Sequence, residues 1–163
     1  MKKILFLGLL FSVNLVSLGE AVPGIVFDEK PNLLFSCDFY TEKKCVIRGF
    51  ETNKRIPRES ETVDLKVISE TFNKYAISGS IDIVGHTDST GSKNYNQKLS
   101  LIRANNVAIL FREYGLDNKF TFKIIGKGES EPSDINETKI GRYNNRRVEI
   151  FFKDLKLKEE KNN

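Results

Sequence analysis

The sequence predicts an α/β (α+β) fold, a two-layer sandwich of order βαβαβ(α)β with a mixed four-stranded sheet and helices on one face. A short N-terminal hairpin extension precedes it. Two segments with helical periodicity, 59–75 and 95–114, alternate with short segments in which apolar residues recur at every second position. Strands joined by helical crossovers favour parallel neighbours and place their helices on one side of the sheet. A hydrophobic content of 39% and a charged content of 29% are typical of a globular domain.

The N-terminus predicts export. Met1, Lys2 and Lys3 precede an apolar run, with small residues near Gly19 and Ala21, which is typical of a secretory signal peptide. The run spans about 15 residues, fewer than a membrane span needs, so an uncleaved anchor is the less favoured alternative. The chain then divides into a signal peptide (1–21), an N-terminal extension (22–44), the main domain (45–153) and a charged tail (154–163) that we expect to fray.

The two cysteines lie in a predicted hairpin. Strands over 33–40 and 45–50 flank the turn 41–44, and an antiparallel pair centred there places Cys37 nearly opposite Cys45. An oxidising compartment would let the two form a disulfide, and two reduced thiols are the alternative. No second Cys or His pair accompanies them, which disfavours a metal site.

The first half of the main domain predicts a strand, a helix and a second strand. The strand covers 44–51 and the helix runs from about 59 to 75. The helix carries an apolar stripe at every fourth residue, widened by two neighbours: Val63, Val67, Thr71 and Tyr75, with Ile68 and Phe72. A turn over 76–80 should lead into a strand over 81–84 that ends at Gly85 or His86.

The second half predicts a longer helix and two further strands. The helix covers 95–114, ends at Gly115 and buries one side: Leu99, Ile102, Val107, Leu110, Phe111 and Tyr114. Residues 120–124 alternate as a strand, and a loop or short helix fills 126–141. The last strand covers 147–152 and points three side chains inward: Val148, Ile150 and Phe152.

The most informative stretch joins the middle strand to the long helix. It places a carboxylate, Asp88, after the strand and a guanidinium, Arg103, inside the helix, with the flexible Gly91 between them. Asn96 and Arg103 are seven residues apart and share a helix face, with Leu99 between them. Opposite charges held apart in this way suit a ligand with an ammonium and a carboxylate on one carbon, the free end of an amino acid. The pattern favours binding over catalysis. The plainer alternative is a loop cap at Asp88 and a surface ion pair at Arg103.

The run from Ile81 to Phe152 resembles the OmpA-like domain, the peptidoglycan-binding module of outer membrane protein A and of peptidoglycan-associated lipoproteins. The matching pieces are Gly85–Ser92, Tyr95–Asn96, Leu99–Ser100, Arg103–Ala104, Val107, Gly126–Glu129, Pro132, Asn136–Thr138, Gly141–Arg142 and Asn145–Ile150. The first strand lacks the Phe-x-Phe-Asp pattern of that family, and the hairpin with two cysteines is not a general family feature. These departures concern the loop 51–57.

The resemblance implies non-covalent binding of the peptidoglycan stem peptide through its diamino acid, of the diaminopimelate type, without cofactor or metal. Asp88 would hold the ammonium of that residue and Arg103 its carboxylate. The same pocket would be lined by Thr87, Gly91, Asn96, Leu99 and Arg146. It also implies a periplasmic, wall-associated protein, with the inner face of the outer membrane as one expected location, and with other envelope proteins as further partners.

Two neighbours of these residues carry separate expectations. Arg146 and Arg147 stand at a strand start, where alternation sends them to opposite faces, so at most one belongs to the pocket. His86, the single histidine, is expected to be structural.

Two other functions stay open. A metal-assisted wall hydrolase using His86 and Asp88 would lack a second ligand pair and an activated nucleophile. A protein–protein interaction module would use residues 22–44. Loss of residues 1–21 lowers the net charge from +4 to +3, which is too weak and scattered to indicate nucleic acid but suits a partner with negative groups, such as a cell-wall polymer.

Overall fold

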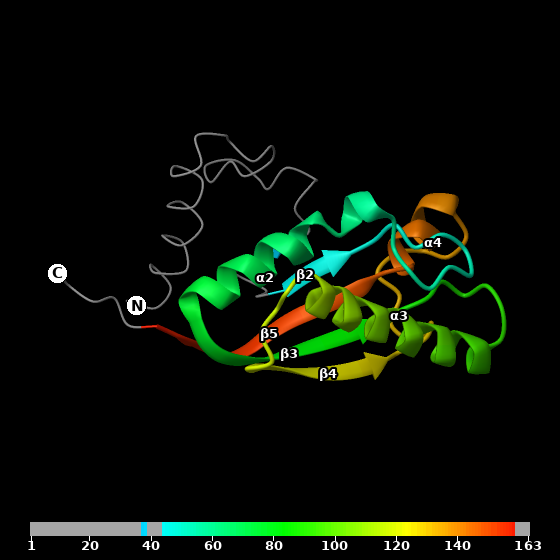
Figure 1. The fold of residues 1–163 in the computed structure, drawn as a ribbon. Helices are drawn as coiled ribbons and strands as arrows, with labels where there is room; N and C mark the ends of the chain where they lie inside the picture. The colour runs from blue at the N-terminus through cyan, green and yellow to red at the C-terminus, as the bar shows by residue number, and fades with distance from the viewer. Residues whose placement is uncertain (1–36, 39–43, 159–163) are drawn as a thin grey trace.

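The computed structural model describes residues 37–38 and 44–158 (Figure 1). The predicted signal peptide, most of the N-terminal extension and the last five residues of the tail lie outside the described residues. The elements, in chain order, are β1 (Cys37–Asp38), β2 (Lys44–Ile47), the 3-10 turn η1 (Glu59–Glu61), α2 (Val63–Tyr75), β3 (Ala76–Gly85), α3 (Lys93–Glu113), β4 (Phe120–Gly126), α4 (Lys139–Asn145) and β5 (Val148–Leu157).

The strands form one mixed sheet in the order β1-β2-β5-β3-β4. β3 and β4 pair in parallel, as the helical crossover between them predicts, and β5 runs antiparallel between β2 and β3. The four longer strands are the predicted mixed four-stranded sheet, and the two-residue β1 extends it at one edge. Helices α2 and α3 lie side by side over one face of the sheet (Figure 1). The two-layer sandwich is therefore confirmed.

The core fills the space between the helices and the sheet. Its fully buried side chains come from both layers: Leu65, Ile68, Val107, Phe111, Ile81, Ile83, Val148 and Ile150. The stripe predicted for the first helix was partly wrong, because Val63 is 53% exposed while Leu65 is fully buried. At 3.6 residues per turn, positions two apart point to nearly opposite sides, so a stripe through Leu65, Ile68 and Phe72 leaves Val63 outside.

Helix α3 approaches the sheet unusually closely at its first half. A Cβ at Gly85 would lie 1.9 Å from the carbonyl oxygen of Ser100, and one at Gly126 would lie 2.7 Å from the Ser100 hydroxyl oxygen. Both glycines are therefore required by close approach of backbones. Leu99, Val107 and Phe111 are buried as predicted, whereas Ile102, Leu110 and Tyr114 are only half-buried. Four small or polar residues outside the predicted buried side are buried as well: Ser100, Arg103, Ala104 and Ala108. The close approach sets the first turns of α3 beside the loop that follows β3.

Three strand boundaries differ from the prediction. β3 begins at Ala76 instead of residue 81, and β5 continues to Leu157 instead of fraying from residue 153. The two extensions pair with each other, from Ile81 with Phe152 to Ala76 with Leu157, across irregularities in the register. The sequences of the two extensions carry little strand signal, and both lie in the sheet because they pair with each other and because Gly79 and Ser80 also pair with β4. β2 is also shorter than predicted and ends at Ile47.

The predicted hairpin pairing is confirmed. Cys37 lies opposite Cys45 in the antiparallel register of β1 and β2, and the two sulfurs are bonded at 2.01 Å. Cys45 is fully buried in the core, so the disulfide attaches the edge strand directly to the packed interior.

Candidate functional site

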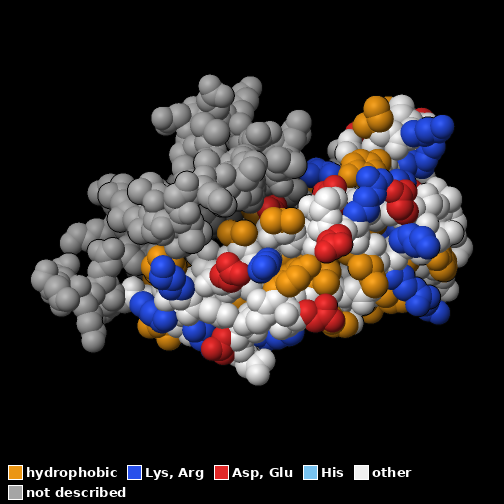
Figure 2. Space-filling model, turned by 45° about the horizontal axis from the view of Figure 1, so that its top comes forward, with side chains coloured by type: hydrophobic (Ala, Val, Ile, Leu, Met, Phe, Trp, Pro, Cys, Tyr) orange, Lys and Arg blue, Asp and Glu red, His pale blue; other side chains and the backbone are white. Residues whose placement is uncertain are grey.

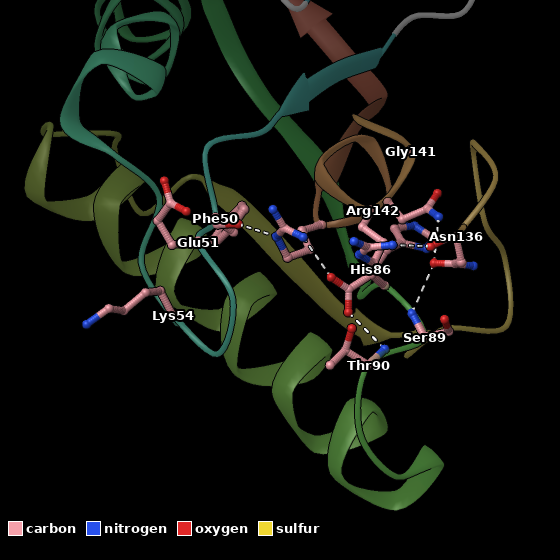
Figure 3. Close-up of polar contacts among 12 residues, drawn as sticks. Phe50, Glu51, Lys54, His86, Ser89, Thr90, Asn136, Gly141 and Arg142 are labelled. Carbon is pink, nitrogen blue, oxygen red and sulfur yellow. Dashed lines mark hydrogen bonds and ion pairs between the residues drawn. The ribbon is translucent and has the colours of Figure 1, made fainter. Parts of the chain in front are cut away.

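Asp88 lies in the loop between β3 and α3 and is 4% exposed. Its Oδ1 accepts a hydrogen bond from the backbone N–H of Thr90 (3.0 Å), and its Oδ2 accepts one from Nη1 of Arg146 (2.7 Å) (Figure 3). The start of the loop is fixed by backbone bonds, from the His86 N–H to the Arg147 carbonyl and from the Thr87 N–H to the Gly128 carbonyl, each 2.9 Å. The carboxylate is thus both ion-paired and rigidly held.

Arg103 is fully buried, and its guanidinium donates only to neutral backbone carbonyls. Nε donates to Lys54 (2.9 Å), Nη1 to His86 (3.1 Å) and Nη2 to Glu51 (3.3 Å). Burial lowers the pKa of Arg103 to about 10, although the charge of Asp88 opposes that shift. The group therefore keeps its charge at neutral pH, in a place where no carboxylate among the described residues contacts it.

Only one of the two adjacent arginines joins this site. Arg146 donates from Nε to the Phe50 carbonyl (2.7 Å) and from Nη1 to Asp88. Arg147 instead contacts the Glu149 carboxylate (2.9 Å) and the Glu131 carbonyl (3.1 Å). The two arginines separate as expected, but the predicted reason was wrong. Both precede β5, and Arg146 directly follows α4, which ends at Asn145, so strand alternation does not act on them.

The loop after β2 contributes to the site through backbone carbonyls and through the Phe50 ring, whose centroid lies 5.1 Å from Cζ of Arg103. The carbonyls of Phe50, Glu51 and Lys54 accept the bonds from Arg103 and Arg146, of which Figure 3 draws the one at Phe50, and the Arg55 carbonyl accepts one from Asn106 (3.0 Å). Any residue type supplies a carbonyl, so the departures from the family pattern in this region leave the contacts in place. For the same reason, side-chain patterns in the sequence could not reveal them.

The remaining predicted residues surround the same loop. Asn96 is 1% exposed and donates from Nδ2 to the Asp88 carbonyl (3.2 Å) and to Oε2 of Glu129 (2.5 Å). Gly91 has a φ of 102°, a left-handed conformation that favours glycine. Leu99 is buried on α3 between Asn96 and Arg103. Thr87 is buried, and its hydroxyl has no hydrogen-bond partner among residues 37–38 and 44–158.

The segment before α4 contacts the site from the other side. Asn136 accepts on its Oδ1 from the Ser89 N–H (3.1 Å) and from Asn145 (3.0 Å), and its carbonyl accepts from Arg142 (2.7 Å) (Figure 3). The loop after β3 and α4 accordingly lie at the same end of the molecule (Figure 1). The sequence had marked Asn136 and Arg142 as parts of the family pattern, but it gave them no role.

His86 joins the site through its backbone, whereas its buried imidazole lies next to Glu149. Its Nε2 is 3.7 Å from Oε2 of Glu149. The neighbouring His86 imidazole and the Arg147 guanidinium lower the pKa of Glu149 to about 2, against the effect of burial. His86 therefore contacts a carboxylate on β5, which agrees with the structural role expected for it. Within the described part of the chain, no group of three or more His, Cys, Asp or Glu side chains could hold a metal ion.

At the centre of the site, two guanidiniums stand against one carboxylate. Arg103 and Arg146 together carry one more positive charge than Asp88 neutralises. Such a site can accept a carboxylate on the guanidinium side and an ammonium on the aspartate side. On the face drawn in Figure 2, basic and acidic side chains are interspersed among apolar ones, so neither sign of charge dominates that face. Among the described helices, none is long and apolar enough to cross a membrane.

The fold and the site define a member of a known family of domains. The sequence model of the OmpA family matches residues 46–146, more than half of the chain. This protein belongs to the OmpA family.

The relatives include outer membrane proteins. Outer membrane porin F of Pseudomonas aeruginosa is 42% identical over 101 residues, which cover 61% of this chain and 28% of the porin. Outer-membrane lipoprotein YfiB of the same organism is 46% identical over 71 residues, 44% of this chain and 42% of the lipoprotein. The chain thus spans less than half the length of either relative.

Solved structures share the fold. The C-terminal domain of Helicobacter pylori MotB superposes with a TM-score of 0.57 at 23% identity, over 72% of this chain and 86% of that domain. The peptidoglycan-associated lipoprotein of Burkholderia pseudomallei gives 0.57 at 18% identity, over 66% and 89%. The cell wall anchor of the Pseudomonas aeruginosa T6SS gives 0.52 at 31% identity, over 68% and 81%.

Proposed function

We propose that this protein binds bacterial peptidoglycan non-covalently, through the diamino acid of a diaminopimelate-type stem peptide, and carries out no reaction of its own. The observation that carries the proposal is the buried Arg103, a charged fork that only neutral carbonyls satisfy, next to the Asp88–Arg146 pair.

The carboxylate of the ligand would bind at Arg103. The bonds from Arg103 to the Glu51 and Lys54 carbonyls are already charge-assisted, because the guanidinium is ionised. A carboxylate in place of one of these carbonyls adds an opposite charge and can accept from the planar fork at two positions. Both carbonyls belong to a run of exposed residues, 51–56, so a displacement there disturbs little of the core.

The ammonium of the ligand would bind at Asp88. An ionised carboxylate offers about four acceptor positions, and the bonds from Thr90 and Arg146 occupy two of them. An ammonium is donor-only, so Asp88 favours it over a hydroxyl or a second carboxylate. Thr87, Gly91, Asn96 and Leu99 would complete the pocket around the loop.

The relatives support this proposal. One solved neighbour is a peptidoglycan-associated lipoprotein, and the neighbour with 31% identity is a cell wall anchor. Two relatives are outer membrane proteins, which supports a periplasmic location, wall-associated, at the inner face of the outer membrane. Other envelope proteins are further proposed partners.

Sedimentation with insoluble diaminopimelate-type peptidoglycan tests the proposal. We expect wild-type protein to pellet with the wall, and Asp88→Ala and Arg103→Ala to stay in the supernatant. Because Arg103 is fully buried, Arg103→Lys serves as a second variant that keeps the charge but loses the planar fork. Lys123→Ala, an exposed position on β4, is the control that should still pellet. Wall binding by folded Asp88→Ala and Arg103→Lys would contradict the proposal, and soluble fragments released from the wall would indicate a hydrolase.

A further inference from the structure

A carboxylate that the binding proposal does not use, Glu129, stands behind the pocket. It lies in the loop between β4 and α4, is half-buried, and accepts from the side chain of Asn96. We infer that Glu129 is a positioning residue, which fixes the orientation of the Asn96 carboxamide and so makes the site selective for an ammonium group. This inference rests on the proposed function and specifies how one end of the same pocket discriminates.

The orientation of the Asn96 carboxamide depends on the bonds that its two amide hydrogens make. An amide nitrogen carries two hydrogens, and both are used here, one to the Asp88 carbonyl and one to Oε2 of Glu129. The flipped orientation would press the amide oxygen against these same two acceptors and leave the nitrogen without either bond. The carbonyl alone constrains the flip weakly, whereas a carboxylate forms the stronger, charge-assisted bond. Glu129 is therefore the group that decides which way the carboxamide lies.

The amide oxygen of Asn96 faces the loop that carries Asp88. No residue of the described part of the chain donates a hydrogen bond to Oδ1 of Asn96. This oxygen lies beneath the loop that carries Asp88, since a Cβ added at Gly91 would be 3.8 Å from it. Asp88 itself accepts from Thr90, one residue before Gly91. An aspartate carboxylate and an amide oxygen thus border one short loop.

Two acceptors at one loop match a donor-only group. An ammonium has three donors and no acceptor, so it can bind Asp88 and Asn96 Oδ1 together. A flipped Asn96 would present its own N–H₂ to the ammonium, which removes one acceptor and adds a repulsive donor. Loss of Glu129 should then weaken wall binding about tenfold, the factor that corresponds to one charge-assisted bond.

The test compares three variants on two preparations of one wall. Glu129→Ala removes the acceptor, Glu129→Gln retains an acceptor without the charge, and Glu131→Ala removes an exposed carboxylate two residues away in the same loop. Each is sedimented with diaminopimelate-type peptidoglycan and with the same wall after acetylation of its free amines. We expect Glu129→Ala to lose about tenfold in affinity for the native wall and most of its preference for it over the acetylated wall. Glu131→Ala should behave like the wild type within about twofold, and Glu129→Gln, which keeps only a neutral acceptor, should lose less affinity than Glu129→Ala.

Two results would overturn the inference. If Glu129→Ala keeps wild-type affinity and preference, Glu129 does not position Asn96 for the ligand. If Glu129→Gln is as weak as Glu129→Ala, the negative charge matters and the orientation does not.

A second measurement separates this inference from the proposed function. If wild-type protein fails to bind the wall, the proposed function fails, and exchange of the Asn96 side-chain amide protons, followed by NMR, tests the positioning. We expect both protons to be protected in the wild type, in Glu129→Gln and in Glu131→Ala, and protection to fall at least tenfold in Glu129→Ala. Unchanged protection in Glu129→Ala would refute the positioning role.

Discussion

Replacement of Asp88 by Asn should destabilise the protein more than replacement of Arg146 by Met, because the two changes leave opposite charge balances. The Asp88–Arg146 pair is 2.7 Å long, and both side chains are at least 90% buried. Asp88→Asn leaves two buried guanidiniums, those of Arg103 and Arg146, without a counter-charge. Arg146→Met leaves Asp88 and Arg103, a balanced pair of charges. The two variants therefore differ in charge although they break the same ion pair.

The magnitude follows from the cost of an isolated buried charge. Removal of one partner from a buried ion pair costs about 3–5 kcal/mol. Asn keeps an acceptor for the Thr90 N–H, so Asp88→Asn belongs at the lower end, about 3 kcal/mol, which lowers Tm by about 10 °C for a domain of this size. Arg146→Met also loses the bond to the Phe50 carbonyl, yet it removes a buried charge that repels Arg103, so we expect about 1–2 kcal/mol.

Urea unfolding at pH 7 and 25 °C, followed by circular dichroism, measures both free energies of unfolding. The double variant, Asp88→Asn with Arg146→Met, completes a double-mutant cycle and should cost less than the sum of the single changes. If Asp88→Asn lowers the free energy of unfolding no more than Arg146→Met does, the prediction is wrong. That result would mean that the net charge of the site does not affect the stability of the protein.

Two further predictions concern stability. Reduction of the Cys37–Cys45 disulfide should lower the free energy of unfolding by about 2–3 kcal/mol, the chain-entropy value for a short closed loop. Urea unfolding with and without reductant measures this difference. Equal unfolding midpoints, or two free thiols in denatured protein from its native compartment, would contradict the prediction. Glu149→Gln should cost about 1–2 kcal/mol at pH 7, after allowance for solvent screening of this half-buried group, because His86 and Arg147 lower the pKa of Glu149 from 4.5 to about 2. That stabilisation is fully present above about pH 4.5 and is lost as the pH falls toward 2. The difference in the free energy of unfolding between Glu149→Gln and the wild type should therefore become smaller from pH 7 to pH 3. A constant difference would contradict the lowered pKa of Glu149.

Sequence patterns predicted the layers and the order of elements because local periodicity and the core coincide in this fold. Phe120, Val148 and Ile150 lie in segments where apolar residues recur at every second position, and all three are buried in the structure. The same patterns missed the paired ends of β3 and β5, where polar residues such as Ser78 and Lys156 form a strand only in each other's presence. Pairing between segments so far apart leaves no local signal.

The site likewise contains residues that the sequence predicted and contacts that it could not predict. Asp88, Arg103 and Asn96 were predicted because each carries its chemistry in a side chain. Any residue type supplies the backbone carbonyls that bind Arg103, so the sequence gives no sign of these contacts. Glu129 was identified only as part of the family pattern, without a role. The arrangement of acceptors around a side chain, which decides the orientation of an amide or the burial of a charge, exists only in the folded chain.

The contacts that hold Arg103 also limit how tightly a ligand can bind. A carboxylate gains only the difference between its own bonds and those of the carbonyls it displaces at Glu51 or Lys54, because the guanidinium is already satisfied by charge-assisted bonds. The ammonium must likewise share Asp88 with Arg146. Ordering costs reduce the remainder, so the affinity for a single stem peptide should be modest. Under the proposed function, a wall that presents many identical stems would retain the domain through repetition of the ligand more than through the strength of one site.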